Sequence, residues 1–218
     1  MNPSNTSIII CCAGMGTRLG IGTTKALINI GNQPLIIRLL EQLKDYDDIR
    51  IVVGYQSEKV INIVNDYRKD IMFAFNKDYE NNGPAASMWK ALLNARENII
   101  VIDGDIVIEP SSFRNFLNID KECIAFSFLD SDEPVYLNII DGKVMHFSNK
   151  KTKYIFPGII KIKKEKINKG ENYIYETIDS SLPIEAMEIN AMEIDTQDDY
   201  EAVIQWLNND YKGGTSNE

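Results

Sequence analysis

Mostly apolar runs alternate with segments of helical periodicity along the first 130 residues of the chain. Such runs predict strands that are buried on both faces, and they occur at 7–12, 49–53, 71–75, 98–102 and 124–128. Between them, apolar side chains spaced by three and four residues predict helices at 35–43, after Ser57 as an N-cap, at 85–94 and from Ser112. Strands and helices in strict alternation predict an α/β fold with a Rossmann-like, mostly parallel sheet flanked by helices.

The alternation ends near residue 130. Two segments with the pattern of strands, 135–140 and 144–148, enclose the turn Asp141-Gly142-Lys143 and predict a small antiparallel hairpin region. A further strand is expected at 156–162 and a last helix at 198–207. Because the sequence contains neither a repeat nor a linker, we expect a single domain over 1–210, followed by a flexible tail at 211–218.

Charge and length exclude several classes of protein. The 218 residues include 23 Lys+Arg and 32 Asp+Glu, which gives a formal net charge of −9. A nucleic acid is therefore not expected as a partner, because phosphate backbones are bound by basic surfaces. No apolar stretch reaches the ~18–20 residues that a membrane span requires. No basic segment precedes the first apolar run, so we expect neither a membrane segment nor a signal peptide.

Cysteine and histidine usage narrows the chemistry further. Three cysteines, of which Cys11 and Cys12 are adjacent, make a poor disulfide framework and favour a reducing cytoplasm. The single histidine, His146, argues against a histidine-rich zinc site and against a Ser-His-Asp triad. The chemistry is therefore expected to rest on other residue types.

A glycine-rich loop at 13–20 follows the first strand, where backbone N–H groups can hold phosphates. It does not match the dinucleotide-binding motif, because its third glycine is one position late and the second strand ends at Gly54 rather than at an acidic residue. Nor does it match the P-loop, because Lys25 is preceded by Thr24 instead of glycine. Two cations, Arg18 and Lys25, beside such a loop in an acidic chain favour a functional role over solvated surface charge.

The segment Ala13–Leu19, followed by Lys25, resembles the signature of nucleotidyltransferases with a GT-A-like fold. Within that superfamily it is most similar to the bacterial branch of CTP-dependent phosphocholine and phosphoglutamine cytidylyltransferases. Family members usually have a proline before the lysine, where this chain has Thr24. The segment Ile102–Asp105 is similar to the family's metal motif, and Asp195 is similar to its second metal-binding aspartate. The resemblance extends over nearly the whole chain.

This resemblance implies a Mg²⁺-dependent reaction in which a phosphate oxygen of the acceptor attacks the α-phosphorus of a nucleoside triphosphate and pyrophosphate leaves. Asp105 and Asp195 would hold the metal ion, since Mg²⁺ prefers one or two carboxylates together with substrate phosphates. Arg18 would bind the β- and γ-phosphates, and Lys25 would bind the α-phosphate, where charge builds up in the transition state. The alternative for Asp195 is a helix cap, and Asp198-Asp199 are expected to be first-turn helix charges.

The resemblance also implies a nucleotide-binding set that consists of Ala13, Gly14, Gly16, Thr17, Asn82, Ser87 and Asp103. In the family, the loop that contains Asn82 contacts the base, and an Asn-Asn pair followed by Ser87 resembles the cytidylyltransferases. The alternative is that Asn82 and Ser87 cap the following helix. The alternative for Asp103 is a turn residue, because Asp-Gly is a common turn pair.

The domain would then divide into a nucleotide-binding part at about 7–128 and an acceptor-binding hairpin region at about 129–190. Aromatic and acidic side chains that could suit a quaternary ammonium group are Trp89, Asp130, Glu133, Tyr136, Tyr154, Phe156, Tyr173, Tyr175 and Glu176. Ordinary core or rim positions are the alternative for most of these aromatic residues.

We therefore expect a cytidylyltransferase that transfers CMP from CTP to phosphocholine, L-glutamine phosphate or a similar surface-polysaccharide precursor, with a CDP-linked product and pyrophosphate. A homodimer is one assembly that this interpretation allows. The alternatives are a sugar-1-phosphate uridylyl- or thymidylyltransferase, and a non-catalytic nucleotide-binding regulatory subunit of the same fold.

Overall fold

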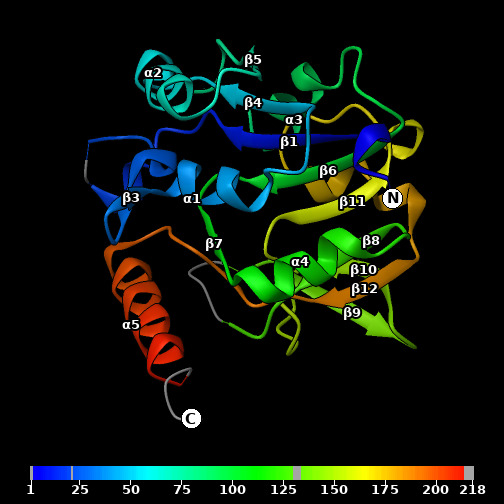
Figure 1. Ribbon diagram of the computed structural model, residues 1–218. Coiled ribbons are helices and arrows are strands. Elements are labelled where there is room, and N and C mark those ends of the chain that lie inside the picture. Colours follow the sequence, from blue (N-terminus) through cyan, green and yellow to red (C-terminus); the bar gives the residue numbers. More distant parts are fainter. Residues whose placement is uncertain (1, 21, 130–133, 214–218) are drawn as a thin grey trace.

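A computed structural model describes residues 2–20, 22–129 and 134–213. Within them, nine strands form one sheet in the order β5-β4-β1-β6-β11-β8-β12-β10-β9 (Figure 1). Its first half is parallel and consists of β1 (Thr6–Cys12), β4 (Ile49–Val53), β5 (Ile71–Phe75) and β6 (Asn98–Asp103). Strand β1 lies between β4 and β6, with Ile10 opposite both Ile51 and Ile102. The parallel strands are the mostly apolar runs of the sequence, as a sheet covered on both faces requires.

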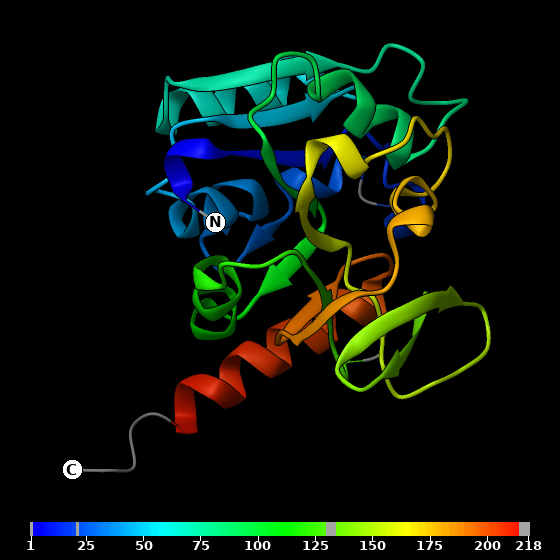
Figure 2. The same cartoon turned by 90° about the vertical axis from the view of Figure 1, so that its right-hand side faces the viewer.

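The second half of the sheet is mixed. Strand β11 (Ile159–Lys163) is antiparallel to both β6 and β8 (Cys123–Phe126), and β8 is parallel to β12 (Ile184–Glu188). The predicted hairpin consists of β9 (Tyr136–Ile140) and β10 (Lys143–Ser148). It forms one end of the sheet and lies at the lower right of Figure 2. The predicted α/β class, with a parallel sheet flanked by helices and a small hairpin region, is confirmed.

Two short sheets complete the strand pairing. Strands β2 (Asn29–Ile30) and β3 (Gln33–Pro34) form one of them, and β7 (Ile106–Ile108) pairs with β13 (Ala191–Glu193) in the other. The remaining short elements are single turns of 3₁₀ helix: η1 (Pro3–Asn5), η2 (Thr17–Leu19), η3 (Lys25–Leu27), η4 (Lys164–Lys166), η5 (Ile174–Thr177) and η6 (Asp179–Ser181).

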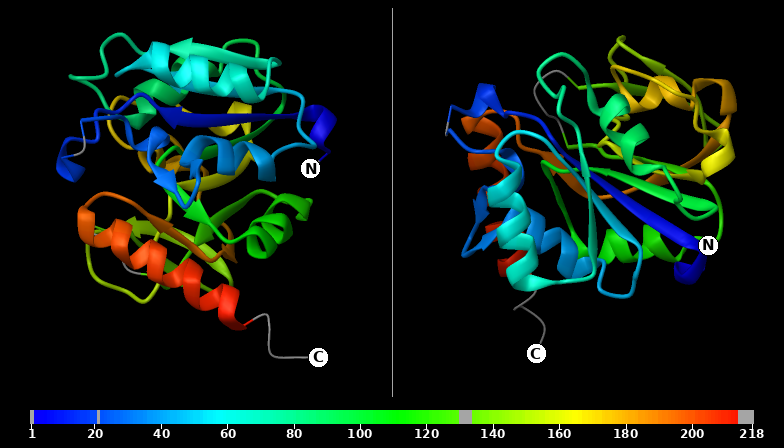
Figure 3. Two further views of the ribbon diagram at one scale, coloured as in Figure 1. Left: turned by 60° about the vertical axis from the view of Figure 1, so that its left-hand side comes forward. Right: turned by 90° about the horizontal axis from the view of Figure 1, so that it is seen from above.

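Helices cover both faces of the sheet. Three of them, α1 (Leu35–Gln42), α2 (Ser57–Tyr67) and α4 (Pro110–Asn118), pack with Ile8 and Ile10 in one core. Helix α3 (Pro84–Ala91) packs with Ile9 on the other face. Helix α5 (Gln197–Gly213) lies at the opposite end of the sheet from α2 (Figure 3). The two faces of β1 therefore contribute to separate cores, because successive side chains of a strand alternate between faces.

Several helix boundaries differ from those that the sequence predicts. Ser57 is the first residue of α2 and not its N-cap, which is Gln56. Helix α4 begins at Pro110 rather than at Ser112, because the carboxylate of Glu109 accepts hydrogen bonds from the N–H groups of Ser111 and Ser112.

Helix α3 also ends earlier than predicted. We expect a helix at 85–94 with Trp89 and Leu93 toward the core, but α3 ends at Ala91 and these side chains are 39% and 77% exposed. Leu93 follows the end of the helix, so the helical spacing no longer determines the direction of its side chain. A left-handed residue, Asn94 with φ of 56°, comes directly after it.

The last helix is longer than predicted. Helix α5 continues to Gly213, so residues 211–213 of the expected tail lie in it, and residues 214–218 lie outside the described part. A flexible tail at 211–218 stays a prediction. Among the residues that the structure describes, no helix combines the length and the hydrophobicity of a membrane span.

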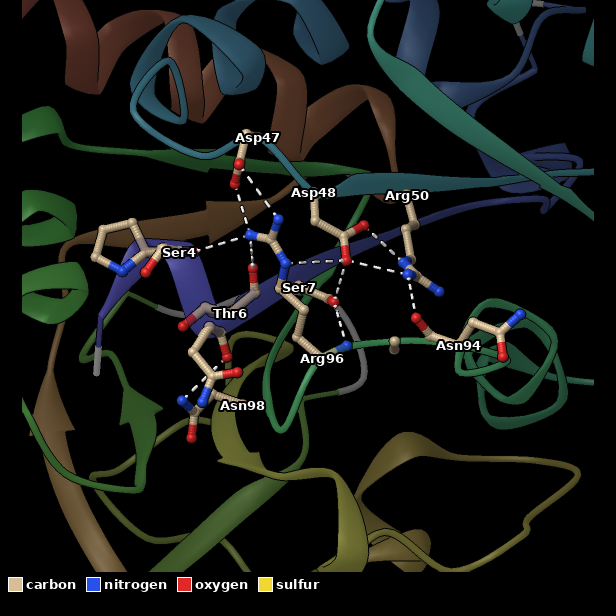
Figure 4. Close-up of polar contacts among 12 residues, drawn as sticks. Ser4, Thr6, Ser7, Asp47, Asp48, Arg50, Asn94, Arg96 and Asn98 are labelled. Atoms are coloured by element: carbon tan, nitrogen blue, oxygen red, sulfur yellow. Dashed lines mark hydrogen bonds and ion pairs between the residues drawn. The ribbon is translucent and has the colours of Figure 1, made fainter.

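A polar network fixes helix α3 to the amino-terminal edge of the sheet (Figure 4). Arg50, only 3% exposed, donates from Nε and Nη2 to the two carboxylate oxygens of Asp48 at 2.8 and 3.0 Å. Its guanidinium also donates to the carbonyl oxygens of Ala91, Leu93 and Asn94 at 2.9, 2.6 and 2.8 Å. Arg50 therefore binds carbonyl groups at the end of α3, which otherwise have no partner within the helix.

A second buried cation joins β11 to α4. The side chain of Lys161 has no exposed surface, and its Nζ donates to the carbonyl oxygens of Phe116, Leu117 and Ile119 at 2.8, 2.9 and 2.9 Å. These carbonyls lie at the carboxyl end of α4, where a cation is favoured by the helix dipole. Lys161, on a central strand of the sheet, thus provides hydrogen-bond donors to the carbonyl groups at the end of α4.

Replacement of this lysine tests the contact. We expect Lys161→Met, which keeps the length of the side chain, to lower the free energy of unfolding by about 3 kcal/mol, because three carbonyl oxygens lose their donor. The matched control is Lys163→Met on the same strand, whose ammonium pairs with Glu97 at 3.2 Å on the surface. That change is expected to cost less than about 1 kcal/mol. Equal urea midpoints for the two variants would contradict the role of Lys161.

Candidate functional site

A cleft of about 540 Å³ opens at the carboxyl ends of β1, β5 and β6, the usual place of ligand sites in such sheets. A smaller hollow of about 200 Å³ lies beside it, beneath the glycine loop. Both hollows are lined by Arg18, Lys25 and Asp105. The structure brings every residue of the predicted site to one or both of them, namely Ala13, Gly14, Gly16, Thr17, Arg18, Lys25, Asn82, Ser87, Asp103, Asp105 and Asp195.

Four charged side chains meet in the cleft. Nζ of Lys25 lies 2.8 Å from Oδ2 of Asp105 and also contacts Oδ1 of Asp195. Nη2 of Arg18 lies 3.2 Å from Oδ2 of Asp195. The lysine therefore lies between two carboxylates that would otherwise repel each other, and the arginine contacts the outer side of the second.

The β7–β13 pair brings the two carboxylates together from distant parts of the chain. Asp105 directly precedes β7, in which Ile106 is opposite Glu193 of β13. The N–H of Ile194 donates to the carbonyl oxygen of Asp105 at 3.0 Å, and Asp195 is the next residue. Backbone pairing thus fixes the separation of the two aspartates before their side chains interact.

Helix α5 does not use Asp195 as its cap. The carboxylate of Asp199 accepts from the N–H groups of Asp195 and Thr196 at 3.0 and 2.8 Å, while the N–H of Asp199 donates to Oγ1 of Thr196 at 3.2 Å. Asp198 and Asp199 are both in the first turn of α5, as predicted. The capping alternative for Asp195 is therefore wrong, and its carboxylate faces the cations of the cleft.

The glycine loop makes room for Lys25. Gly16 has φ of 60°, and a Cβ atom at this residue would lie 2.8 Å from Cγ of Lys25. A larger residue would thus be strained in its backbone and would displace the lysine side chain. Burial by itself lowers the pKa of Lys25, but the charges of Asp105 and Asp195 and their hydrogen bonds raise it well above its usual value. Lys25 is therefore a permanent cation near neutral pH.

Two further carboxyl groups line the cleft, those of Asp103 and Glu193. Burial and the charge of Asp105 raise the pKa of each well above its usual value. Asp103 is the last residue of β6 and directly precedes the turn that the next two residues form, so it occupies the first position of that turn. Its Oδ2 would lie 2.2 Å from a Cβ atom at Gly158, so only glycine fits there. Glu193 was missed from the sequence, where the only signal is its place two residues before Asp195.

Asn82 and Ser87 are joined by a residue that the sequence analysis missed. Asn76, 1% exposed, directly follows β5, and its Nδ2 donates to Oδ1 of Asn82 at 2.6 Å and to Oγ of Ser87 at 2.9 Å. The N-cap of α3 is Gly83, without any side-chain hydrogen bond to the helix. The capping alternative for Asn82 and Ser87 is therefore wrong, and all three polar side chains line the cleft.

Aromatic rings also line the cleft. Tyr173 and Tyr175 are stacked with ring centroids 5.2 Å apart, and Tyr175 is stacked on Phe147 at 4.9 Å. Phe147 in turn meets Phe156 edge-on at 5.2 Å. Phe156, Tyr173 and Tyr175 line the cleft, so this row of rings offers an apolar surface with an electronegative face to a ligand.

The other aromatic and acidic candidates lie elsewhere. Tyr136 is buried in β9, Trp89 is on the outer side of α3, and Tyr154 packs against Phe126 and Phe128. One carboxylate oxygen of Glu176 accepts from the N–H of Tyr173 at 3.3 Å. Two further candidates, Asp130 and Glu133, lie outside the described residues.

The two cleft aspartates offer oxygen donors that converge on one point, because a single ammonium nitrogen contacts both. In the described part of the chain, no three His, Cys, Asp or Glu side chains form a group that could hold a metal ion. The residues thus provide two carboxylates, a set that suits Mg²⁺ when substrate phosphates complete the coordination.

Comparisons with known proteins extend this description. Residues 8–140, more than half of the chain, match the model of the MobA-like NTP transferase domain. The chain is 28% identical over 193 residues to the bifunctional protein GlmU of Methanococcus maripaludis, and the match covers 83% of this chain and 44% of that protein. The GlmU of Nitratiruptor sp. is 27% identical over 130 residues, which are 59% of this chain and 30% of that protein. The chain thus spans less than half the length of these curated relatives.

Two solved structures share the fold. The CTP:phosphocholine cytidylyltransferase from Streptococcus pneumoniae (LicC) has a TM-score of 0.78 at 23% identity, over 93% of this chain and 99% of that chain. The inositol-1-phosphate CTP transferase from T. maritima has a TM-score of 0.75 at 17% identity, over 92% of this chain and 96% of that chain. At these identities the likeness shows the fold alone, which is the GT-A-like fold of nucleotidyltransferases. Together with the family match over residues 8–140, this fold establishes that the chain belongs to the family of MobA-like NTP transferase domains.

Proposed function

We propose that this protein is a Mg²⁺-dependent cytidylyltransferase that transfers CMP from CTP to a small phosphorylated metabolite, with a CDP-linked product and pyrophosphate. The observation that carries the proposal is the convergence of Arg18, Lys25, Asp105 and Asp195 beside the glycine loop. Two cations and two carboxylates in one cleft suit a reaction between two anions, in which catalysis consists of positioning and charge stabilisation.

The transfer is a displacement at the α-phosphorus. A phosphate oxygen of the acceptor forms the new bond, the bond between the α-phosphorus and the bridging oxygen breaks, and pyrophosphate leaves with the electron pair. Arg18 binds the β- and γ-phosphates, because its planar guanidinium matches two phosphate oxygens at once. Lys25 binds the α-phosphate oxygen on which negative charge develops. Backbone N–H groups of Gly14, Gly16 and Thr17 bind the triphosphate, and Ala13 borders the nucleotide.

Asp105 and Asp195 would hold the Mg²⁺ ion, which when bound supplies positive charge to the triphosphate. Lys25 moves from these carboxylates to the phosphate as the nucleotide enters. Before the exchange, the charges and hydrogen bonds of Asp105 and Asp195 raise the pKa of Lys25, and afterwards the phosphate supplies the negative charge. The lysine thus has an anionic partner before and during the reaction.

The directions of the hydrogen bonds around Asn82 and Ser87 support cytosine as the base. Asn76 donates to Oδ1 of Asn82 and to Oγ of Ser87, so these two atoms already act as acceptors. The hydroxyl hydrogen of Ser87 and an amide hydrogen of Asn82 are left to donate toward the cleft. Cytosine offers two adjacent acceptors, N3 and O2, whereas N3 of uracil carries a hydrogen and would meet a donor. We propose on this basis that CTP is preferred over UTP.

The row of rings supports an acceptor with a cationic or apolar group. Tyr173, Tyr175 and Phe156 line the cleft, and the electronegative face of a ring attracts an ammonium ion. Phosphocholine, L-glutamine phosphate and similar precursors of surface polysaccharides therefore head the proposed acceptors. On this basis we propose a nucleotide-binding part at about 7–128 and an acceptor-binding region at about 129–190.

Cysteine usage bears on the location of the protein. All three cysteines, each within the described residues, are free thiols, which suits a reducing cytoplasm. A homodimer and a place in capsule biosynthesis stay predictions.

A screen of pyrophosphate release tests the proposed function. CTP, UTP, dTTP and GTP are combined with phosphocholine, L-glutamine phosphate, glycerol phosphate and sugar 1-phosphates in the presence of Mg²⁺. We expect release with CTP and one of the non-sugar acceptors. Release with UTP or dTTP and a sugar 1-phosphate would identify the first alternative. Binding of CTP without release from any pair would favour a regulatory subunit.

Removal of the central cation tests its role in the chemical step. We expect Lys25→Ala to lower kcat by ~10²-fold or more, because transition-state charge on the α-phosphate loses its partner. The matched control is Lys59→Ala on the exposed side of α2, which should leave kcat unchanged. Steady-state kinetics decide the question, and a turnover of Lys25→Ala equal to that of the control would contradict the assignment.

Thermal unfolding tests the choice of base. A ligand that binds only the folded state raises Tm according to its affinity, so CTP should raise Tm more than UTP at equal concentration with Mg²⁺. In Ser87→Ala this difference should shrink, because the donor to the base is lost while Asn76 remains. Ser180→Ala, whose hydroxyl accepts from Asn168 at 2.8 Å on the surface, is the control and should keep the difference. Equal protection of the unchanged protein by both nucleotides would contradict the cytidylyl preference.

A further inference from the structure

The turn Gly54–Gln56, between β4 and α2, contacts the glycine loop (13–20) and its continuation toward Lys25 at two separate points, Ala13 and Gly22. We propose that Gln56 is a positioning residue for Lys25, because its side-chain amide holds the segment of the loop that directly precedes the lysine. The proposal rests on the proposed function for the role of Lys25, whereas the contacts of Gln56 stand independently of it.

The amide of Gln56 uses both its donor and its acceptor on this segment. Its Nε2 donates to the carbonyl oxygen of Gly22 at 2.9 Å, and its Oε1 accepts from the hydroxyl of Thr23 at 3.1 Å. Thr24, only 2% exposed, follows, and Lys25 begins the next 3₁₀ turn. The second contact, at Thr23, is thus two residues before Lys25, whose ammonium group contacts both aspartates.

The loop needs such contacts because its own backbone is weakly constrained. Gly16, Gly20 and Gly22 have φ of 60°, 69° and 66°, and glycine loses more conformational freedom on ordering than any other residue. Contacts from a rigid neighbour offset that cost. Strand β4, which ends just before the turn, lies in the parallel half of the sheet and is buried along its whole length.

The same turn also holds the start of the loop. The N–H of Tyr55 donates to the carbonyl oxygen of Ala13 at 3.0 Å. Gly54 packs so closely that a Cβ atom there would lie 2.7 Å from this oxygen. One rigid turn therefore fixes both ends of the segment 13–25, and with them the distance between the phosphate-binding N–H groups and Lys25.

The conformation of Gln56 favours a role beyond helix capping. It is the N-cap of α2, but its side chain makes no hydrogen bond to that helix. Its backbone is left-handed, with φ of 49° and ψ of 35°, which costs a non-glycine residue about 1–2 kcal/mol. Glycine would remove that cost, but it would also remove the amide that holds Gly22 and Thr23. Gln56 therefore stabilises the loop with its side chain, although its own backbone is strained.

Two substitutions separate the side chain from the backbone. Gln56→Ala removes the amide and keeps the left-handed strain, whereas Gln56→Gly removes both. The matched control is Gln33→Ala, because Gln33 is likewise a glutamine whose side-chain amide is hydrogen-bonded, to Glu41 at 2.7 Å, but away from the cleft. Hydrogen exchange of the amides of residues 14–25, Tm, and kcat with the KM of the acceptor are measured for all three variants and the unchanged protein.

We expect both Gln56 variants to exchange faster at residues 14–25 and to lose kcat by about tenfold or more, because small displacements of a catalytic group cost rate steeply. The KM of the acceptor should stay within about twofold, and Gln56→Gly should be the more stable of the two. The control should behave like the unchanged protein in every measurement.

Three results would overturn the proposal: exchange at 14–25 that is unchanged in both variants, faster exchange with unchanged kcat, or a loss of kcat in Gln56→Ala that Gln56→Gly restores. The last result would assign the effect to the backbone instead of the amide. If the unchanged protein transfers no nucleotide to any acceptor, the proposed function fails, and the exchange measurement alone decides whether Gln56 holds the loop.

Discussion

Two carboxylates that lie side by side in a partly buried cleft are the constraint on which the rest of this structure depends. The side chains of Asp105 and Asp195 are 28% and 10% exposed, so water screens their repulsion only in part. Lys25 lies between them and Arg18 lies on the outer side of Asp195. Without a cation at this point the two carboxylates would repel each other. The surrounding loop, turn and short sheet can all be understood as the means of bringing these charges together.

The charges of the cleft are arranged in opposite pairs. Arg18 and Lys25 contact Asp195, and Lys25 also contacts Asp105. Burial raises the pKa of the two other carboxyl groups, Asp103 and Glu193. In the proposed reaction, the two cations would exchange carboxylate partners for phosphate partners, so that each keeps an anionic partner.

The parallel half of the fold could be predicted from the sequence, and the pairings that build the site could not. Strands β4 and β5 have the predicted bounds because apolar runs at 49–53 and 71–75 are bounded by polar residues. Strand β13 carries the polar residue Glu193, so no local pattern indicates it, and its pairing with β7 joins segments that are distant in the chain. Asn76 is a single polar residue after a strand, and only its buried contacts with Asn82 and Ser87 reveal its importance.

The most direct test of the account is a crystal structure of the protein with CTP, Mg²⁺ and no acceptor. The account predicts the triphosphate beneath the glycine loop, Nζ of Lys25 within hydrogen-bond distance of an α-phosphate oxygen, and the carboxylates of Asp105 and Asp195 on the metal ion. A nucleotide bound elsewhere, with Lys25 still between the two aspartates, would contradict it.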